Sequence, residues 1–371
     1  MAESNLHMLS KRGQSVWIDY LSRDMLEEGE LARMMRDDAV VGVTSNPTIF
    51  QKAISHGSRY DDQIKELLAH ENDAKEIFLQ LSARDVEAAL DLLGPVHEKT
   101  GCDGFVSWEV DPTLAYDREA TFAEAMRLHA WLERPNLYVK IPATQPGLGA
   151  IEDCVAQGKN INVTLIFSLR RYAEVVEAYL RGLERLVAGG GNPKSVYSVA
   201  SFFVSRVDSE ADKRLDAIGS KEALALRGKL AVANAKLAYE HYQQTFAGPR
   251  WEFLAGKGAN TQRCLWASTS TKNPEYSDVL YVEDLIGPDT VDTMPEETIE
   301  AFQDHGTVNG DTVEQGVNEA HAVFEKIAKV GVDYEDVTKT LELEGVQKFA
   351  DSFAQLLGGV MQKRDLVAAA S

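Results

Sequence analysis

Eight short runs of apolar and β-branched residues recur along the chain, and helical patterns separate most of them. This alternation predicts a parallel sheet with helices packed outside it. Eight repeats of the unit favour a closed barrel over an open sheet, so we expect an α/β fold of the (β/α)8 TIM barrel type. The expected strands are residues 15–20, 40–44, 104–110, 137–141, 160–167, 195–204, 263–268 and 290–294.

Helical periodicity fills the intervals between the strands and continues beyond the last one. Gly189-Gly190-Gly191 predicts a helix stop and not a phosphate loop, because the run follows a helical pattern. No fixed repeat and no linker rich in Pro or Ser divides the chain, so we expect residues 1–371 to form one barrel domain with helical additions. The expected helical stretches are residues 21–36, 51–98 (two or three helices), 172–187 and a C-terminal segment, 296–371, of helices only.

Length and charge exclude several classes of protein. The 371 residues, 44% of them hydrophobic, can bury the core of a barrel enlarged by extra helices. A net charge of -20 disfavours nucleic acid and anionic membranes as partners. We expect no membrane span and no signal peptide, because no apolar run is long enough and residues 1–15 are polar.

The cysteines and histidines do not form the patterns of a disulfide framework or a metal site. Cys102, Cys154 and Cys264 are odd in number, and their spacing fits neither disulfides nor zinc. The eight histidines show no HxxxH or HxH grouping, so we expect no metal. A reducing compartment, and therefore a cytoplasmic location, is the expected setting.

Charged and polar side chains interrupt the expected strands. Asp19 lies in the first, Glu109 ends the third and Lys140 lies within the fourth. Thr164 interrupts the fifth strand, and Ser201 and Arg206 close the sixth. A buried charge costs several kcal/mol unless it is paired. Three such charges in three strands therefore point to the barrel mouth, where catalytic sites of this fold lie.

Lys140 is the strongest single signal, because it interrupts the apolar run Tyr138 to Pro142. Burial disfavours its charged form, and a neutral amine can attack a ketone to form an imine. Once protonated, the imine accepts electrons and permits cleavage of the adjacent carbon–carbon bond. Alternatively, Lys140 forms a buried salt bridge with Asp19 or Glu109, and the strand context alone leaves both readings open.

The other candidates also carry two readings. Asp19 and Glu109 can divide acid and base tasks, or they can simply balance Lys140 or Arg206. Asn46, held extended before Pro47, can aim its amide at a substrate hydroxyl or merely form an Asn-Pro turn. After the sixth and seventh strands come residues that suit a phosphate but also suit an ordinary solvated loop: Arg206, Ser268, Ser270 and Lys272.

Five blocks of residues, taken together and in this order, resemble the signatures of the transaldolase family. The resemblance covers residues 12–350, and the length and the Thr-Lys-Asn-Pro segment look like the actinobacterial type. The blocks are GVTSNPTIF (42–50), NLYVKIPAT (136–144), INVTLIFS (161–168), SFFVSRVD (201–208) and WASTSTKNP (266–274).

The resemblance implies a transferase of the pentose phosphate pathway (the pentose shunt) with a class I aldolase mechanism. Lys140 would form a Schiff base with the C2 ketone of fructose 6-phosphate or sedoheptulose 7-phosphate. Glu109, with Thr164 through an ordered water, would assist loss of water, and Asp19 would take the C4 hydroxyl proton. The dihydroxyacetone unit would then pass to glyceraldehyde 3-phosphate or erythrose 4-phosphate. No metal and no organic cofactor would be needed.

The same resemblance implies the binding residues for small-molecule sugar phosphates. Asn46 and Ser201 would hold the dihydroxyacetone hydroxyls, Phe203 would wall the pocket and Arg206 would grip the phosphate. The better-known branch has Ser-Pro-Phe where this chain has Ser201-Phe202-Phe203, and Gly in place of Ser205. That branch also has an arginine after the seventh strand, where Lys272 is the nearest cation, and the two cations are not equivalent at a phosphate.

Other functions stay open at this stage. A fructose 6-phosphate aldolase would release free dihydroxyacetone, but such relatives are much shorter. A fused transaldolase–isomerase would need a second catalytic domain, for which 371 residues leave no room. A non-catalytic barrel that binds sugar phosphates is the alternative outside the enzymes. The sequence does not predict the oligomeric state, the preferred sugars or any regulation.

Overall fold

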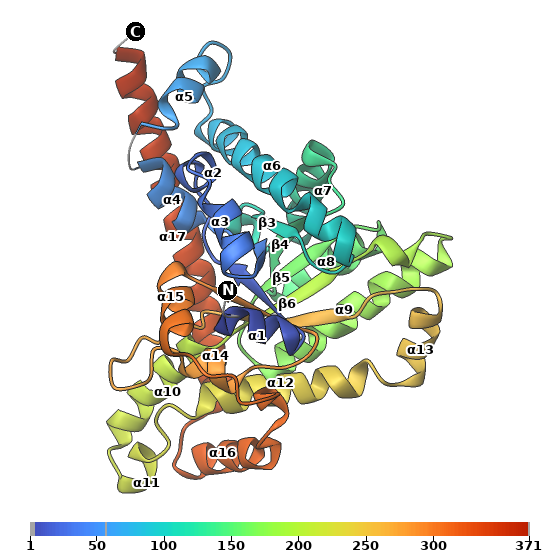
Figure 1. Cartoon of the computed structure of the whole chain (residues 1–371), viewed down its shortest axis with the longest axis vertical. Coiled ribbons are helices and arrows are strands. Elements are labelled where there is room, and N and C mark those ends of the chain that lie inside the picture. The colour runs from blue at the N-terminus through green and yellow to red at the C-terminus, as the bar shows by residue number, and fades with distance from the viewer. Residues whose placement is uncertain (1–3, 56–57, 370–371) are drawn as a thin grey trace.

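The computed structural model describes residues 4–55 and 58–369, with the backbone alone at position 55 and at positions 367–369. Eight parallel strands close into a barrel in sequence order, which confirms the predicted TIM barrel (Figure 1). Each predicted strand is present within a few residues of its expected bounds, and β8 coincides with them. The strands are β1 Gln14–Ile18, β2 Val40–Val43, β3 Phe105–Glu109, β4 Leu137–Pro142, β5 Ile161–Ile166, β6 Ser198–Phe203, β7 Gln262–Ala267 and β8 Thr290–Met294.

Helices surround the barrel, and several begin at a residue whose side chain accepts a backbone N–H of the first turn. Asp73, Thr144 and Ser168 cap α6, α8 and α9 in this way. The α-helices are α1 Asn5–Lys11, α2 Arg23–Glu27, α3 Glu30–Asp37, α4 Pro47–Ser55, α5 Asp61–Leu67, α6 Ala74–Thr100, α7 Arg118–Leu132, α8 Gln145–Ala156, α9 Leu169–Ala188, α10 Ser205–Ile218, α11 Lys221–Leu224, α12 Leu230–Thr245, α13 Pro249–Gly256, α14 Leu280–Asp284, α15 Glu296–His305, α16 Val317–Lys329 and α17 Tyr334–Ala369. Short 3-10 turns lie at η1 Pro112–Leu114, η2 Pro193–Ser195 and η3 Thr312–Glu314.

Three details of the prediction were wrong. The single helix expected over residues 21–36 is two helices, α2 and α3, because Gly29 adopts a left-handed φ of 77° between them. Arg206 does not close β6 but lies in the first turn of α10. Asp19 follows the last residue of β1 instead of lying within the strand.

Other helical predictions were confirmed. The interval 51–98 contains parts of three helices, α4, α5 and α6. Helix α9 ends at Ala188, with Gly189 as its C-cap. Beyond β8 the regular elements in the described residues are all helical (α15, η3, α16 and α17), with short irregular segments between them, while residues 370 and 371 of the predicted tail lie outside the described part.

Aromatic side chains fill the lower part of the barrel. Trp17 of β1 lies 6.1 Å, ring to ring, from Tyr138 of β4, and Tyr138 stacks on Phe105 of β3 at 4.2 Å. Trp17 passes directly over Gly42 of β2, where a Cβ atom would lie 2.4 Å from the Trp17 ring. These buried rings form a packed floor beneath the carboxyl ends of the strands.

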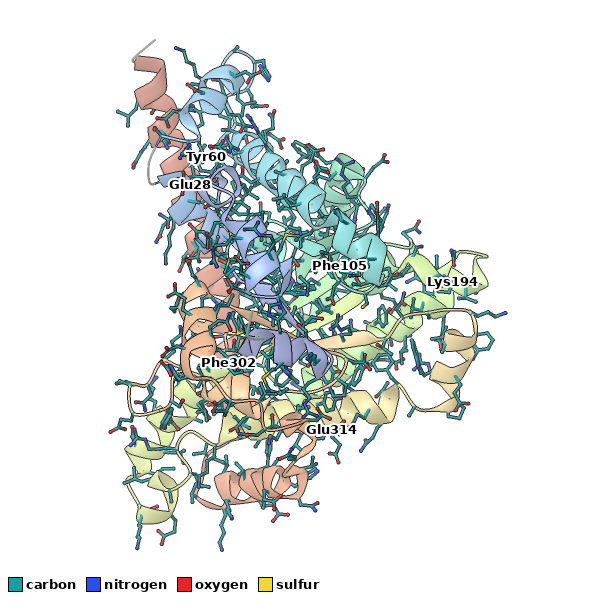
Figure 2. The ribbon with its side chains drawn as sticks, viewed as in Figure 1. Glu28, Tyr60, Phe105, Lys194, Phe302 and Glu314 are labelled. Atoms are coloured by element: carbon teal, nitrogen blue, oxygen red, sulfur yellow. The ribbon has the colours of Figure 1, made fainter. Side chains whose placement is uncertain are left out.

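The long helix α17 runs along one side of the molecule and contacts α4, α5, α6 and α10 (Figure 1). Tyr60, labelled in Figure 2, ties the neighbouring elements together. Its hydroxyl accepts the Arg23 N–H of α2 and donates to Asp85 of α6. Among the helices in the described residues, none is both long and apolar enough to cross a membrane.

Candidate active site

The carboxyl ends of the strands surround a cavity of about 590 Å³. One predicted residue, Glu109, lies behind Lys140 instead of on the cavity wall. The other predicted residues all line the cavity: Asp19, Asn46, Lys140, Thr164, Ser201, Phe203, Arg206 and Lys272. Predicted residues from six separate segments of sequence therefore line the cavity, and Glu109 adds a seventh segment at the end of the barrel where this fold carries its chemistry.

Lys140 projects from β4 into the bottom of this cavity and is 5% exposed. Its Nζ donates a hydrogen bond of 3.1 Å to the backbone oxygen of Ser45, whose own hydroxyl is tied to Ser107 of β3. The Phe349 ring lies 5.8 Å from the same nitrogen. The amine is thus held in place mainly by a neutral carbonyl, with an apolar ring beside it.

Glu109 is the register partner of Lys140 on β3, and its Oε2 lies 3.6 Å from the lysine Nζ. Both carboxyl oxygens are buried and accept no hydrogen bond from the described residues. Burial raises the pKa of Glu109 to about 7, against the opposing charge of Lys140. A carboxyl poised near neutrality can either give or take a proton at this amine.

Asp19 also lines the cavity, half-buried directly after the end of β1. Thr44 Oγ1 donates to its Oδ1 at 2.7 Å, so the Thr293 hydroxyl, 2.7 Å from Thr44, must donate in turn to Thr44. Burial raises the pKa of Asp19, while the Lys140 charge, the Thr44 hydrogen bond and the Arg206 charge oppose that rise. The hydroxyl chain fixes the carboxylate through Oδ1, and Asp19 lines the cavity, where it can act as a base.

A chain of neutral polar groups crosses the barrel beneath the lysine. Ser201 Oγ donates to Asn162 Oδ1 at 2.7 Å, and Asn162 Nδ2 donates to Ser107 Oγ at 3.0 Å. Ser201 can still accept a hydrogen bond from a ligand. Sequence reasoning missed Asn162, although it stands two residues before Thr164 on β5 and therefore shares its face. The Thr164 hydroxyl is buried with no hydrogen-bond partner in the described part of the chain.

Asn46 fits both of its readings. Its Oδ1 accepts the Ile49 N–H at 3.1 Å and so caps the start of α4, as an Asn-Pro turn would. Its Nδ2 carries two further donors, and the residue lines the cavity. The cap holds the amide in a fixed orientation at the cavity wall.

Cations gather at the outer wall of the cavity. The Arg206 guanidinium lies 5.1 Å over the Phe203 ring, and Lys272 Nζ donates to Ser270 Oγ at 2.6 Å. Burial lowers the pKa of Arg206, and within the described residues no carboxylate pairs with it at ion-pair distance. Sequence reasoning missed Lys348, which α17 adds to the same wall, because a helical pattern does not reveal which barrel face a helix covers. This local positive charge suits a phosphate despite a net charge of -20.

Comparison with known proteins supports the same chemistry. Residues 16–360 match the family described as Transaldolase/Fructose-6-phosphate aldolase. A transaldolase of Frankia alni is 53% identical over 359 residues, which is 96% of this chain and 97% of that protein. A transaldolase of Acidothermus cellulolyticus is 53% identical over 95% of both chains. Transaldolase 1 of Streptomyces coelicolor is 50% identical over 97% of this chain and 95% of its own. The chain therefore belongs to the transaldolase/fructose-6-phosphate aldolase family.

Proposed function

We propose that this chain is a transaldolase of the pentose phosphate pathway that carries a dihydroxyacetone unit as a Schiff base on Lys140. The donor is sedoheptulose 7-phosphate or fructose 6-phosphate, and the acceptor is glyceraldehyde 3-phosphate or erythrose 4-phosphate. The observation that carries the proposal is a buried amine 3.6 Å from a carboxyl of near-neutral pKa, at the bottom of a cavity with a cationic rim. Full-length relatives called transaldolase support it.

In the first step, the neutral amine of Lys140 attacks the C2 carbonyl of the donor and forms a carbinolamine. Glu109, in its protonated form, supplies the proton with which the former carbonyl oxygen leaves as water. The buried Thr164 hydroxyl is free to orient a water molecule for this transfer. The product is a protonated imine, whose positive charge is the electron sink for the next step.

In the second step, Asp19 takes the proton of the C4 hydroxyl. The electrons of the C3–C4 bond move into the protonated imine, the bond breaks, and an aldose phosphate leaves. An enamine of dihydroxyacetone remains on Lys140. Addition of the enamine carbon to the aldehyde of the acceptor reverses these steps, and hydrolysis of the imine returns the free amine.

The remaining predicted residues bind the substrate. Asn46 Nδ2 and Ser201 Oγ hold the hydroxyls of the dihydroxyacetone unit, and Phe203 forms an apolar wall. Arg206 grips the phosphate bidentately, with Lys272 as a point charge nearby.

The proposed location of the enzyme is the reducing cytoplasm, and the three cysteines, which are free thiols, are compatible with it. We also propose that residues 1–371 form one domain.

The second candidate within the family is a fructose 6-phosphate aldolase that releases free dihydroxyacetone. The same enamine forms in both enzymes, and only its fate differs. An assay with donor alone, without acceptor, separates them: a transaldolase releases little dihydroxyacetone until an aldose phosphate is added. Steady release without acceptor would favour the aldolase.

The Schiff base is tested by incubating the protein with fructose 6-phosphate and sodium borohydride, which reduces the imine to a stable amine. We expect a covalent mass increase on the peptide that contains Lys140, absent in Lys140→Ala and unchanged in Lys257→Ala, which replaces an exposed lysine at the C-terminal end of α13. Absence of an adduct on the unmodified chain would refute the enzymatic mechanism and leave the non-catalytic sugar-phosphate-binding barrel.

A further inference from the structure

Helix α17 places two consecutive side chains on the wall of the catalytic cavity, Lys348 and Phe349. Phe349 is buried, with its ring 5.8 Å from Lys140 Nζ, whereas Lys348 is exposed at the rim. Both residues lie more than two hundred positions after Lys140 in the sequence, on the helix that runs along one side of the molecule (Figure 1). It therefore contributes to the cavity directly and does not merely cover the barrel from outside.

The helix is fixed firmly enough for such a role. Val346, Phe349 and Phe353 form its buried face. The Phe353 ring meets Phe78 of α6 edge to face at 5.7 Å, and α17 packs along α4. Because apolar burial anchors the backbone on both sides of Lys348, the position of this lysine at the rim is set by the fold, and its long side chain covers the remaining distance.

Lys348 stands among other cations instead of carboxylates. The Arg206 charge is the main cause that lowers the pKa of Lys348, followed by burial and by the charges of Lys272 and Lys52. Within the described residues Lys348 makes no ion pair. The like charges of Lys348, Arg206 and Lys272 repel one another in the free protein, and a dianion bound between them relieves that repulsion.

We propose that Lys348 binds the phosphate group of the sugar phosphate together with Arg206, so that α17 supplies one wall of the phosphate site. This inference rests on the proposed function. Phosphate monoesters present three oxygens, which a planar guanidinium and two point charges can share. Lys348 thus makes the enzyme selective for phosphorylated sugars over free ones.

The test compares Lys348→Met, which keeps an unbranched side chain one atom shorter but removes the charge, with the unmodified enzyme. We expect the KM for fructose 6-phosphate to rise about 5- to 10-fold and the inhibition constant of inorganic phosphate to rise in parallel, as for loss of one charge-assisted hydrogen bond at an exposed rim. The kcat should stay within about twofold, because the group acts on bound and transition states alike. Lys348→Arg should retain the low KM.

Two controls isolate the phosphate. Lys339→Met removes an exposed lysine of the same helix that lines a separate hollow between α9 and α17, and it should leave the KM unchanged. Borohydride trapping with dihydroxyacetone, which lacks a phosphate, should give the same adduct yield in Lys348→Met as in the unmodified chain.

The outcomes are distinguishable. An unchanged KM and phosphate inhibition in Lys348→Met would overturn this inference and leave the proposed function intact. Equal weakening of trapping with dihydroxyacetone would assign Lys348 to packing of α17 and also overturn it. If the unmodified chain forms no adduct on Lys140 with dihydroxyacetone, the proposed function itself fails.

Discussion

Glu109 and Lys140 face each other as register partners on β3 and β4, with 3.6 Å between the carboxyl Oε2 and the amine Nζ. This separation exceeds an ordinary hydrogen bond between nitrogen and oxygen. The charge of Lys140 therefore opposes the rise in the pKa of Glu109, while the carboxyl does not hold the amine in a direct hydrogen bond. An amine held in this way can still turn toward a carbonyl, and a proton needs to move only a short distance between the partners.

Glu109→Gln should slow imine formation about 100- to 10,000-fold, because amide replaces the carboxyl as proton donor. In the unmodified enzyme the acid form of Glu109 is lost as pH rises through about 7, so the rate of imine formation should fall above that pH. The variant should lose this limb of the pH profile. The measurement is the initial rate of borohydride-trapped adduct against pH, with Glu325→Gln on the surface of α16 as control.

Thr44→Val should impair bond cleavage more than imine formation. The change removes the hydrogen bond that lowers the pKa of Asp19, so that pKa rises and the base limb of the transfer rate should move to higher pH. Transfer should fall about 10-fold while adduct with fructose 6-phosphate still forms. Thr44→Ser keeps the hydroxyl and should behave like the unmodified chain; a matching loss in that variant would contradict the explanation.

Arg206→Met should raise the KM for fructose 6-phosphate about 10- to 100-fold, the loss expected for a charged hydrogen-bonding partner of phosphate. Arg206→Lys should recover a part of this, since lysine restores charge but not the bidentate geometry. Trapping with dihydroxyacetone should persist in both variants. Loss of trapping would show that Arg206 supports the lysine and not the phosphate.

Asp292→Asn should stabilise the protein at high pH relative to low pH. Burial raises the pKa of Asp292 to about 7, and one of its oxygens has no hydrogen-bond partner in the described part of the chain. A raised carboxyl pKa contributes stability below the unfolded pKa and loses it as pH rises through about 7.

In the Asp292→Asn variant that loss disappears. The free energy of unfolding of the variant minus that of the unmodified chain should therefore increase by about 1–3 kcal/mol between about pH 5 and about pH 8. Urea denaturation at both values measures it, and the difference between pH values excludes the constant cost of the unpaired amide. A pH-independent change would show that Asp292 ionises normally in the folded chain.

Gly42→Ala should destabilise the barrel by about 1–3 kcal/mol, because its methyl group would meet the Trp17 ring at 2.4 Å. Gly94→Ala is the matched control, since Gly94 lies within α6 and has no atom within 4 Å of an added Cβ. Alanine there should be neutral or stabilise by about 0.5–1 kcal/mol. Urea midpoints of the two variants give the comparison.

Much of the fold follows from local pattern, since a buried parallel strand leaves a short apolar run with β-branched residues. The two groups closest to the chemistry, Lys140 and Glu109, also show in the sequence because a full charge inside such a run is costly. Asn162 costs less to bury when it is hydrogen-bonded, so it stands out less from its neighbours. The predictions of catalytic roles stay predictions until the variants above are measured.

Other features depend on contacts between distant segments. The residues of α17 form a helical pattern, but the choice of Lys348 and Phe349 as the pair at the mouth depends on how α17 packs against α4 and α6. The sequence around Arg206 is compatible with the end of a strand and with the start of a helix. Only the observed end of β6 decides between these two predictions. Gly29, by contrast, could have been recognised as a helix break from its residue type alone.

The packed floor formed by Trp17, Phe105 and Tyr138 determines the order in which the sugars bind and leave. Because these rings close the lower end of the barrel, donor and acceptor sugars enter and leave through the mouth alone. The aldose phosphate formed from the donor must therefore leave before the acceptor can enter. The dihydroxyacetone unit stays bound to Lys140 as an enamine during this exchange. The lifetime of this enamine, which depends on how well the cavity excludes water, decides whether the three carbons reach the acceptor or are released by hydrolysis.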